Sequence, residues 1–96
     1  MSIINTGDTL VRTEERTSNG AVFQYRLTVR ESDRVASFGI PLYSVAVEMT
    51  DRGNRTEACV RDCFSDAERA FVFFNKVVDH LATPIDLPYI LEDERK

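Results

Sequence analysis

Two cysteines and one histidine are the residues of this sequence best suited to chemistry: Cys59, Cys63 and His80. Thiolates and imidazoles bind zinc and form nucleophile–base pairs. The alternating pattern over 55–64 predicts a β-strand, in which residues four apart share a face but lie about 13 Å apart. Two sulfurs on one zinc ion are separated by at most about 4.6 Å, and a disulfide requires Cα atoms within about 7 Å. Only a helix over 59–63 would bring the cysteines together, so we interpret them as two unrelated thiols on or near a polar sheet face.

The histidine lies on the wrong side of the expected structure to assist either thiol. It falls on a helical stripe facing away from the predicted core, together with Asp66, Arg69, Phe73 and Lys76. A cysteine–histidine pair must lie within hydrogen-bond reach, and the helix dipole already accounts for a histidine near a helix C-terminus. An enzyme would require a cleft that brings His80 or a cysteine near a carboxylate, which this arrangement disfavours. We therefore expect no catalytic residue, metal site or cofactor, and a protein that is not an enzyme.

Period-two alternation predicts the strands that would carry these residues. The clearest strand is 22–31, where Phe23, Tyr25, Leu27 and Val29 alternate with polar side chains. Turn-forming residues divide the rest of the first two thirds of the chain into further strands. We expect these strands at 9–16, 42–50 and 55–64, with turns at 18–20, 32–34 and 51–54.

A helix is predicted over 65–82. Ser65 followed by Glu68 is the arrangement of a capping box, and Thr83–Pro84 ends the helix because the residue before a proline is pushed out of the α region. The apolar residues at helical spacing form one broad face: Ala67, Ala70, Phe71, Phe74, Val77, Val78 and Leu81. Pro88 can start a second, short helix in the tail.

These elements predict a single α+β domain over 1–96. We expect an antiparallel meander sheet of three to four strands, one helix packed on one face, and a short C-terminal helical tail. Burying the apolar sheet face under the helix stabilises the fold by about 1.5–3 kcal/mol for each large side chain. The inward residues would be Phe23, Tyr25, Leu27, Val29, Tyr43, Val45, Val47, Ala58 and Val60. The opposite face would carry Gln24, Arg26, Thr28, Arg30, Ser44, Ala46, Glu48, Cys59 and Arg61.

Composition and charge narrow the functional classes. The chain has 16 acidic and 12 basic residues and a net charge of −4, whereas domains that hold nucleic acid usually carry the opposite balance. No apolar run approaches the length of a membrane span, and Met1–Gly7 lacks the pattern of an export signal. We expect a cytoplasmic protein with reduced cysteines and no membrane partner.

Part of the sequence resembles a small uncharacterised family from Firmicutes, mostly clostridia. The segment 43–48, YSVAVE, is similar to that family's strand motif Y-G-I-x-V-E, with Ser44 in place of the glycine. The segment 83–93 resembles the family's threonine–proline acidic tail, with Asp86 where histidine is common and Pro88 where a polar residue is usual. The resemblance covers about the C-terminal half of the chain. It implies a bacterial cytoplasmic protein with an α+β fold and carries no activity.

Exposed apolar residues suggest what the domain does instead of catalysis. Phe73 interrupts the charged stripe of the helix, so either the apolar tail or a partner must cover it. The candidate contact residues are Phe73, Ile85, Leu87 and Tyr89. We interpret the chain as a non-enzymatic interaction module that binds another protein or, most simply, itself as a homodimer, through this side of the helix or an open sheet edge.

The alternative function is nucleic-acid binding by the arginines of the outer sheet face, Arg26, Arg30 and Arg61. A sheet that reads RNA interleaves stacking aromatics with such arginines. This face has none, and Glu48 lies among the arginines. Nucleic acid is therefore the less favoured partner.

Overall fold

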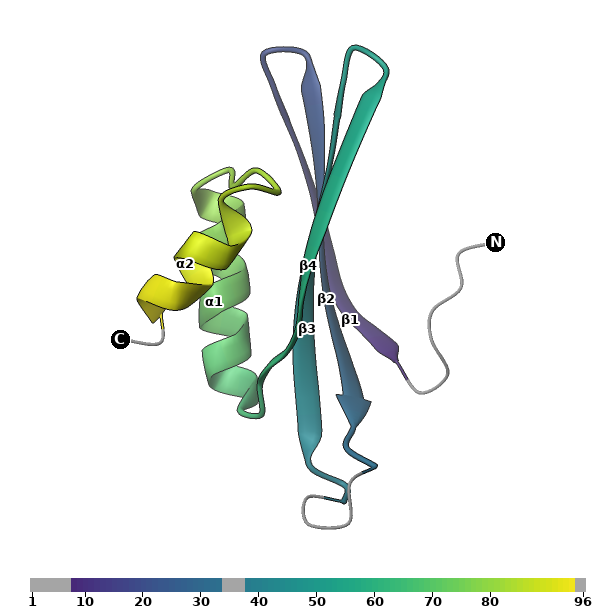
Figure 1. Cartoon of the computed structure of the whole chain (residues 1–96), viewed down its shortest axis with the longest axis vertical. Helices are drawn as coiled ribbons and strands as arrows, with labels where there is room; N and C mark the ends of the chain where they lie inside the picture. The colour runs from purple at the N-terminus through teal and green to yellow at the C-terminus, as the bar shows by residue number, and fades with distance from the viewer. Residues whose placement is uncertain (1–7, 34–37, 95–96) are drawn as a thin grey trace.

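A computed structural model describes residues 8–33 and 38–94 of the chain and confirms the predicted α+β class (Figure 1). Four strands are followed by two helices. Their bounds are β1 (Thr9–Ser18), β2 (Ala21–Glu31), β3 (Pro41–Asp51), β4 (Asn54–Phe64), α1 (Ala67–Asp79) and α2 (Leu87–Glu94).

The four strands form one antiparallel sheet in the order β1-β2-β3-β4. The first hairpin of this meander, β1–β2, and the last, β3–β4, each turn on two residues, Asn19–Gly20 and Arg52–Gly53. All four residues have positive φ, at 53° and 84° in the first turn and 53° and 83° in the second. Such turns follow the right-handed twist of the flanking strands, and glycine adopts the second position without strain. Local sequence therefore sets the register of both hairpins.

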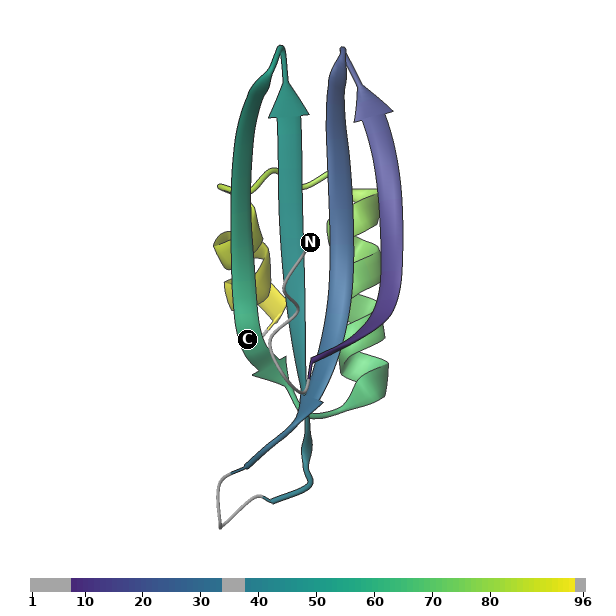
Figure 2. The same cartoon turned by 90° about the vertical axis from the view of Figure 1, so that its right-hand side faces the viewer.

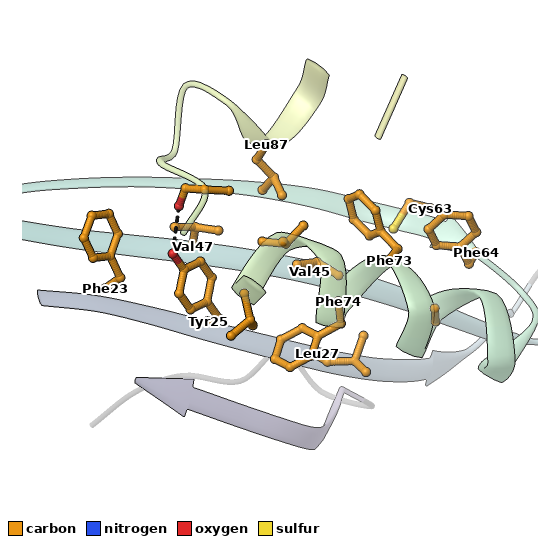
Figure 3. Close-up of a cluster of buried hydrophobic side chains, with 14 of the residues drawn as sticks. Phe23, Tyr25, Leu27, Val45, Val47, Cys63, Phe64, Phe73, Phe74 and Leu87 are labelled. Atoms are coloured by element: carbon orange, nitrogen blue, oxygen red, sulfur yellow. Dashed lines mark hydrogen bonds between the residues drawn. The ribbon is translucent and has the colours of Figure 1, made fainter. Parts of the chain in front are cut away.

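Both helices lie on the same face of the sheet, and in the described part of the chain no helix lies over the other face (Figures 1 and 2). The core fills the space between the sheet and α1 (Figure 3). Its buried residues are Ala21, Phe23, Tyr25, Leu27, Val45, Val47, Cys63, Phe64, Ala70, Phe73, Phe74, Val77, Val78, Ala82 and Leu87. Of the other residues expected to face inward, Tyr43, Ala58 and Val60 are partly buried against this core.

The prediction that Phe73 faces outward is wrong. Its side chain is 0% exposed, and its ring lies 5.4 Å from that of Phe64 at a tilt of 55°, a favourable aromatic geometry. Phe71, assigned to the inner face, is only partly buried. The difference arises because α1 is packed on two sides, by the sheet and by α2, so its buried face is wider and turned relative to the predicted one.

The ends of α1 also differ from the prediction. The N-cap is Asp66, not Ser65, and its side-chain Oδ1 accepts the Glu68 backbone N–H at 3.1 Å. The helix ends at Asp79, where the Leu81 and Ala82 backbone N–H groups donate to Val78 and Val77 carbonyls at 3.0 and 3.1 Å. This pair of bonds is a Schellman motif.

A capping box begins the second helical segment. The Asp86 backbone N–H donates to Thr83 Oγ1 at 3.3 Å, and Asp86 Oδ2 accepts the Thr83 N–H at 3.2 Å. Pro84 occupies the first position after Thr83, where a missing N–H costs nothing. The threonine–proline pair therefore starts the turn into α2, and Pro88 is the second residue of that helix instead of its start.

Removing the capping box should loosen α2. We expect Thr83→Ala or Asp86→Ala to lower the free energy of unfolding by about 1 kcal/mol. Because the two side chains serve one motif, the double variant should cost less than the sum. Chemical denaturation measures both values, with Thr56→Ala, an exposed residue of β4, as the control. Additive losses would contradict the reciprocal bonding.

One hydrogen bond ties the sheet to the connection between the helices. The Tyr25 hydroxyl donates to the Ala82 carbonyl oxygen at 3.0 Å, and both residues are buried. Burial raises the pKa of Tyr25 to about 12, with a smaller lowering by Arg16 and a smaller rise from Asp86. The folded protein therefore favours the neutral phenol, which is the form that donates this bond.

This pKa predicts a specific loss of stability in alkali. The favourable contribution is complete below pH 10, the ordinary pKa of tyrosine, and is lost as the pH rises toward about 12. Tyr25→Phe should cost about 1 kcal/mol at neutral pH. Between pH 8 and 11 the wild type should then lose about 1.4 kcal/mol more than this variant. Urea denaturation at each pH measures the unfolding free energies of the wild type and of Tyr25→Phe. If the two values change in parallel across this pH range, the raised pKa of Tyr25 is refuted.

Candidate functional site

The two cysteines lie on opposite sides of the sheet. Cys59 is exposed on the outer face, as predicted, whereas Cys63 is only 8% exposed and belongs to the core. The prediction that both lie near the polar face is wrong for Cys63, whose thiol donates to the Tyr43 carbonyl at 3.4 Å. No disulfide joins the two thiols, and their separation by the sheet leaves no joint site.

An irregularity in β4 explains this placement. Tyr43 pairs with Phe64 and Val45 with Val60, so three residues, Arg61 to Cys63, span the interval opposite Ser44 alone. Asp62 has a positive φ of 51°, and its backbone N–H donates to Ser44 Oγ at 2.9 Å. A β-bulge re-aims the side chains of the strand that carries it, here turning Cys63 toward the core.

The bulge also engages one arginine of the outer face. The Arg30 guanidinium donates to both carboxylate oxygens of Asp62, at 3.1 and 2.8 Å, and this bonding raises the pKa of Arg30. Arg61 contacts Asp8 at 3.5 Å. Arg26 has no ion pair with any of the described residues. The structure thus places the three arginines on one side of the sheet, with two of them already paired.

Arg26 and Arg61 line a shallow hollow on this open face. It has a volume of about 520 Å³ and is bordered by Ala46, Glu57 and Cys59 in addition to the two arginines. Burial raises the pKa of the Cys59 thiol, and the positive charges of Arg61 and Arg26 act in the opposite direction. Cys59 is therefore mostly a neutral thiol near pH 7.

A second hollow, of about 390 Å³, lies between α1 and α2. It brings His80 together with two carboxylates, Asp86 and Asp93, which the predicted arrangement disfavoured. Lys76 and Tyr89 also line it, and Lys76 forms an ion pair with Glu94. Within residues 8–33 and 38–94, no three histidine, cysteine or acidic side chains are grouped so that they could hold a metal ion.

Two of the four predicted contact residues remain at the surface, and one of them, Tyr89, lines this second hollow. Ile85 is 75% exposed and Tyr89 is 68% exposed, whereas Phe73 and Leu87 are fully buried. Leu87 of the tail is thus buried in the same core as Phe73, whereas two other apolar side chains of the tail remain in water. Neither helix in the described ranges is long and apolar enough to cross a membrane.

Comparison with known proteins places the chain in a family. Residues 6–95 match the model of a family of unknown function, DUF6514. The chain belongs to the DUF6514 family. No curated protein and no solved structure matches it. For this DUF6514 protein, the fold and the surfaces described above are therefore the basis for any functional proposal.

The carboxylate side of the α1–α2 hollow escaped the sequence analysis. The spacing Thr83-x-x-Asp86 fits a capping box and could have indicated where Asp86 would lie. Asp93 lies at the end of the acidic tail segment 83–93, whose sequence does not indicate that it would line a hollow. The bulge at Asp62 has no comparable signal, because the apolar residues Val60 and Phe64 keep the same parity across it.

Ser44 should be important for this bulge in the DUF6514 protein. Its side chain is buried and supplies the acceptor for the Asp62 N–H. Ser44→Ala removes that acceptor and should cost about 1–3 kcal/mol of unfolding free energy. Hydrogen exchange at the Asp62 amide should accelerate. Thr28→Ala, on the paired position of β2, serves as the control, and an equal effect of the two variants would argue against this role.

Proposed function

We propose that this protein is a non-enzymatic interaction module that self-associates through the start of the α2 segment. One observation carries the proposal: Ile85, in the turn that precedes α2, and Tyr89, in α2 itself, are 75% and 68% exposed. Large apolar side chains exposed together mark interaction surfaces more often than side chains exposed singly. Tyr89 also lines the hollow between α1 and α2, which offers a concave surface next to it.

The energetics favour a symmetric pair of chains. Burying a large apolar side chain contributes about 1.5–3 kcal/mol. A two-fold contact uses the same surface on both chains, so each residue contributes twice. Tyr89 also keeps a hydroxyl group that can remain at a wet rim, as tyrosine commonly does at interfaces. The polar groups around the hollow, His80, Asp86 and Asp93, would then orient the contact.

The setting of this activity is also part of the proposal. Two thiols without a disulfide, one of them exposed, fit a reducing compartment such as the cytoplasm. The strand segment 43–48 and the threonine–proline tail support origin in a Firmicutes bacterium, through their resemblance to the family motifs described above.

Nucleic-acid binding by Arg26, Arg30 and Arg61 is the weaker proposal. Asp62 holds Arg30 through two hydrogen bonds, and the net charge of −4 opposes a polyanion. Among the described strand residues, the outer face also carries no aromatic side chain on which single-stranded bases could stack. These features reduce the positive charge that the face can offer.

Sedimentation of the full chain at micromolar concentrations tests self-association. We expect a concentration-dependent dimer that Ile85→Asp and Tyr89→Asp each weaken. Loss of about 1.5 kcal/mol at each of two symmetric positions would raise the dissociation constant about a hundredfold. Because both side chains are exposed, the variants should keep the wild-type circular dichroism spectrum and unfolding midpoint.

Phe38→Asp provides a matched control, since Phe38 is 78% exposed and lies in the β2–β3 connection. The control should dimerise as the wild type does. A strictly monomeric wild type would overturn the proposal, and so would a dimer broken by Phe38→Asp but not by the two α2-segment variants.

A further inference from the structure

The outer face of the sheet carries a row of residues with an unusual mixture of sizes. Arg26, Ala46 and Cys59 are directly paired across β2, β3 and β4. Side chains opposite one another in a sheet lie on the same face, so two small residues are flanked by a long cation. Arg61 follows on β4 and borders the same hollow. The small side chains of Ala46 and Cys59 form the bottom of the hollow. The guanidinium groups of Arg26 and Arg61 can extend over them.

The neighbouring acids are already engaged. Arg55 contacts Glu48 at 2.8 Å and Glu57 at 3.5 Å, which compensates part of the negative charge at that end of the hollow. Asp62 binds Arg30 through both oxygens. The contact of Arg61 with Asp8, at 3.5 Å, is at the long limit for a hydrogen bond. Arg26 has no ion-pair partner in the described part of the chain and therefore contributes an uncompensated positive charge.

We infer that this hollow binds the phosphate group of a small ligand between Arg26 and Arg61. Guanidinium groups present planar pairs of donors that match phosphate oxygens. Arg26 has no ion pair among the described residues, Arg61 is held only by its 3.5 Å contact with Asp8, and the small side chains of Ala46 and Cys59 let the anion approach. A single phosphate requires no base-stacking platform, which this face lacks. The inference concerns the opposite face from Ile85 and Tyr89 and does not depend on self-association.

Cys59 provides a reporter inside the site. The charges of Arg61 and Arg26 lower the pKa of its thiol against the larger effect of burial. A bound phosphate would neutralise these charges and remove their effect. The pKa of the thiol would then rise, which lowers the thiolate fraction and with it the alkylation rate at neutral pH. Cys63 is buried and should react much more slowly.

The experiment measures alkylation of Cys59 by iodoacetamide in the folded full chain. Inorganic phosphate is titrated at constant pH and constant ionic strength, with chloride as the balancing salt, and peptide mass analysis separates the two cysteines. We expect a saturable decrease of the rate. A rate that does not change, or that changes without saturation, overturns the inference.

Variants then assign the effect to the arginines. Arg26→Gln should abolish the phosphate dependence, whereas Arg12→Gln should retain it because Arg12 pairs with Leu27 on the helix side. Perturbation of the Ala46 amide signal by phosphate in a Cys59→Ser variant gives a second readout that needs no thiol. A phosphate effect that persists in Arg26→Gln contradicts the site.

Competing ligands distinguish the sources of anion binding. Acetate at equal ionic strength should protect Cys59 less than phosphate does, because it has a single charge. Protection by acetate as strong as that by phosphate would overturn the assignment to phosphate. A single-stranded RNA oligonucleotide, compared at equal phosphate concentration, should protect no better than inorganic phosphate. Much stronger, salt-sensitive protection by the RNA would replace this inference with nucleic-acid binding.

Discussion

The apolar layer between α1 and the central strands is the part of the structure on which the other elements depend. Phe74 and Val77 of α1 are buried together with Leu27 and Val45 of the sheet. An isolated helix of this length is marginal in water, so α1 exists because this surface accepts it. The position of α1 in turn supplies one wall for α2. The hydrogen bond from Tyr25 to Ala82 then holds the connection between the two helices against the sheet.

The strands were predictable because each depends on local signals. The alternation in 22–31 indicates that one face of this strand is buried, and the glycine-containing turns determine which strands pair in hairpins. The fold class and the strand order of the sheet could therefore be predicted from the sequence. The orientation of α1 was harder to predict, since Phe73 interrupts a stripe of charged residues and is nevertheless buried against Phe64 of β4. A helical wheel assumes one buried side, whereas α1 has two packed sides. The predicted N-cap of α1, Ser65, lies one residue before the observed N-cap, Asp66, because both residue types can cap a helix.

Candidate sites depended even more on tertiary structure. The outer position of Arg26 and Cys59 followed from strand parity and was predicted. The inward turn of Cys63 depends on the bulge at Asp62, which is stabilised by Ser44 from the neighbouring strand. The placement of His80 and Asp86 around one hollow depends on the path of the chain after Leu81, whose φ of 52° is unusual for a residue with a branched side chain. Neither feature has a periodic signature.

The connectivity of the meander has a consequence for how the chain folds. Each hairpin at the ends of the sheet closes a loop of two residues, so little chain entropy opposes the pairing of its strands. The bond between Tyr25 and Ala82, by contrast, joins residues 57 positions apart. Loop-closure entropy grows only logarithmically with this distance, but docking the helices also requires a sheet face that is already assembled. We therefore expect the hairpins to form early and the helical layer to dock late, so that this layer sets how fast the native chain opens.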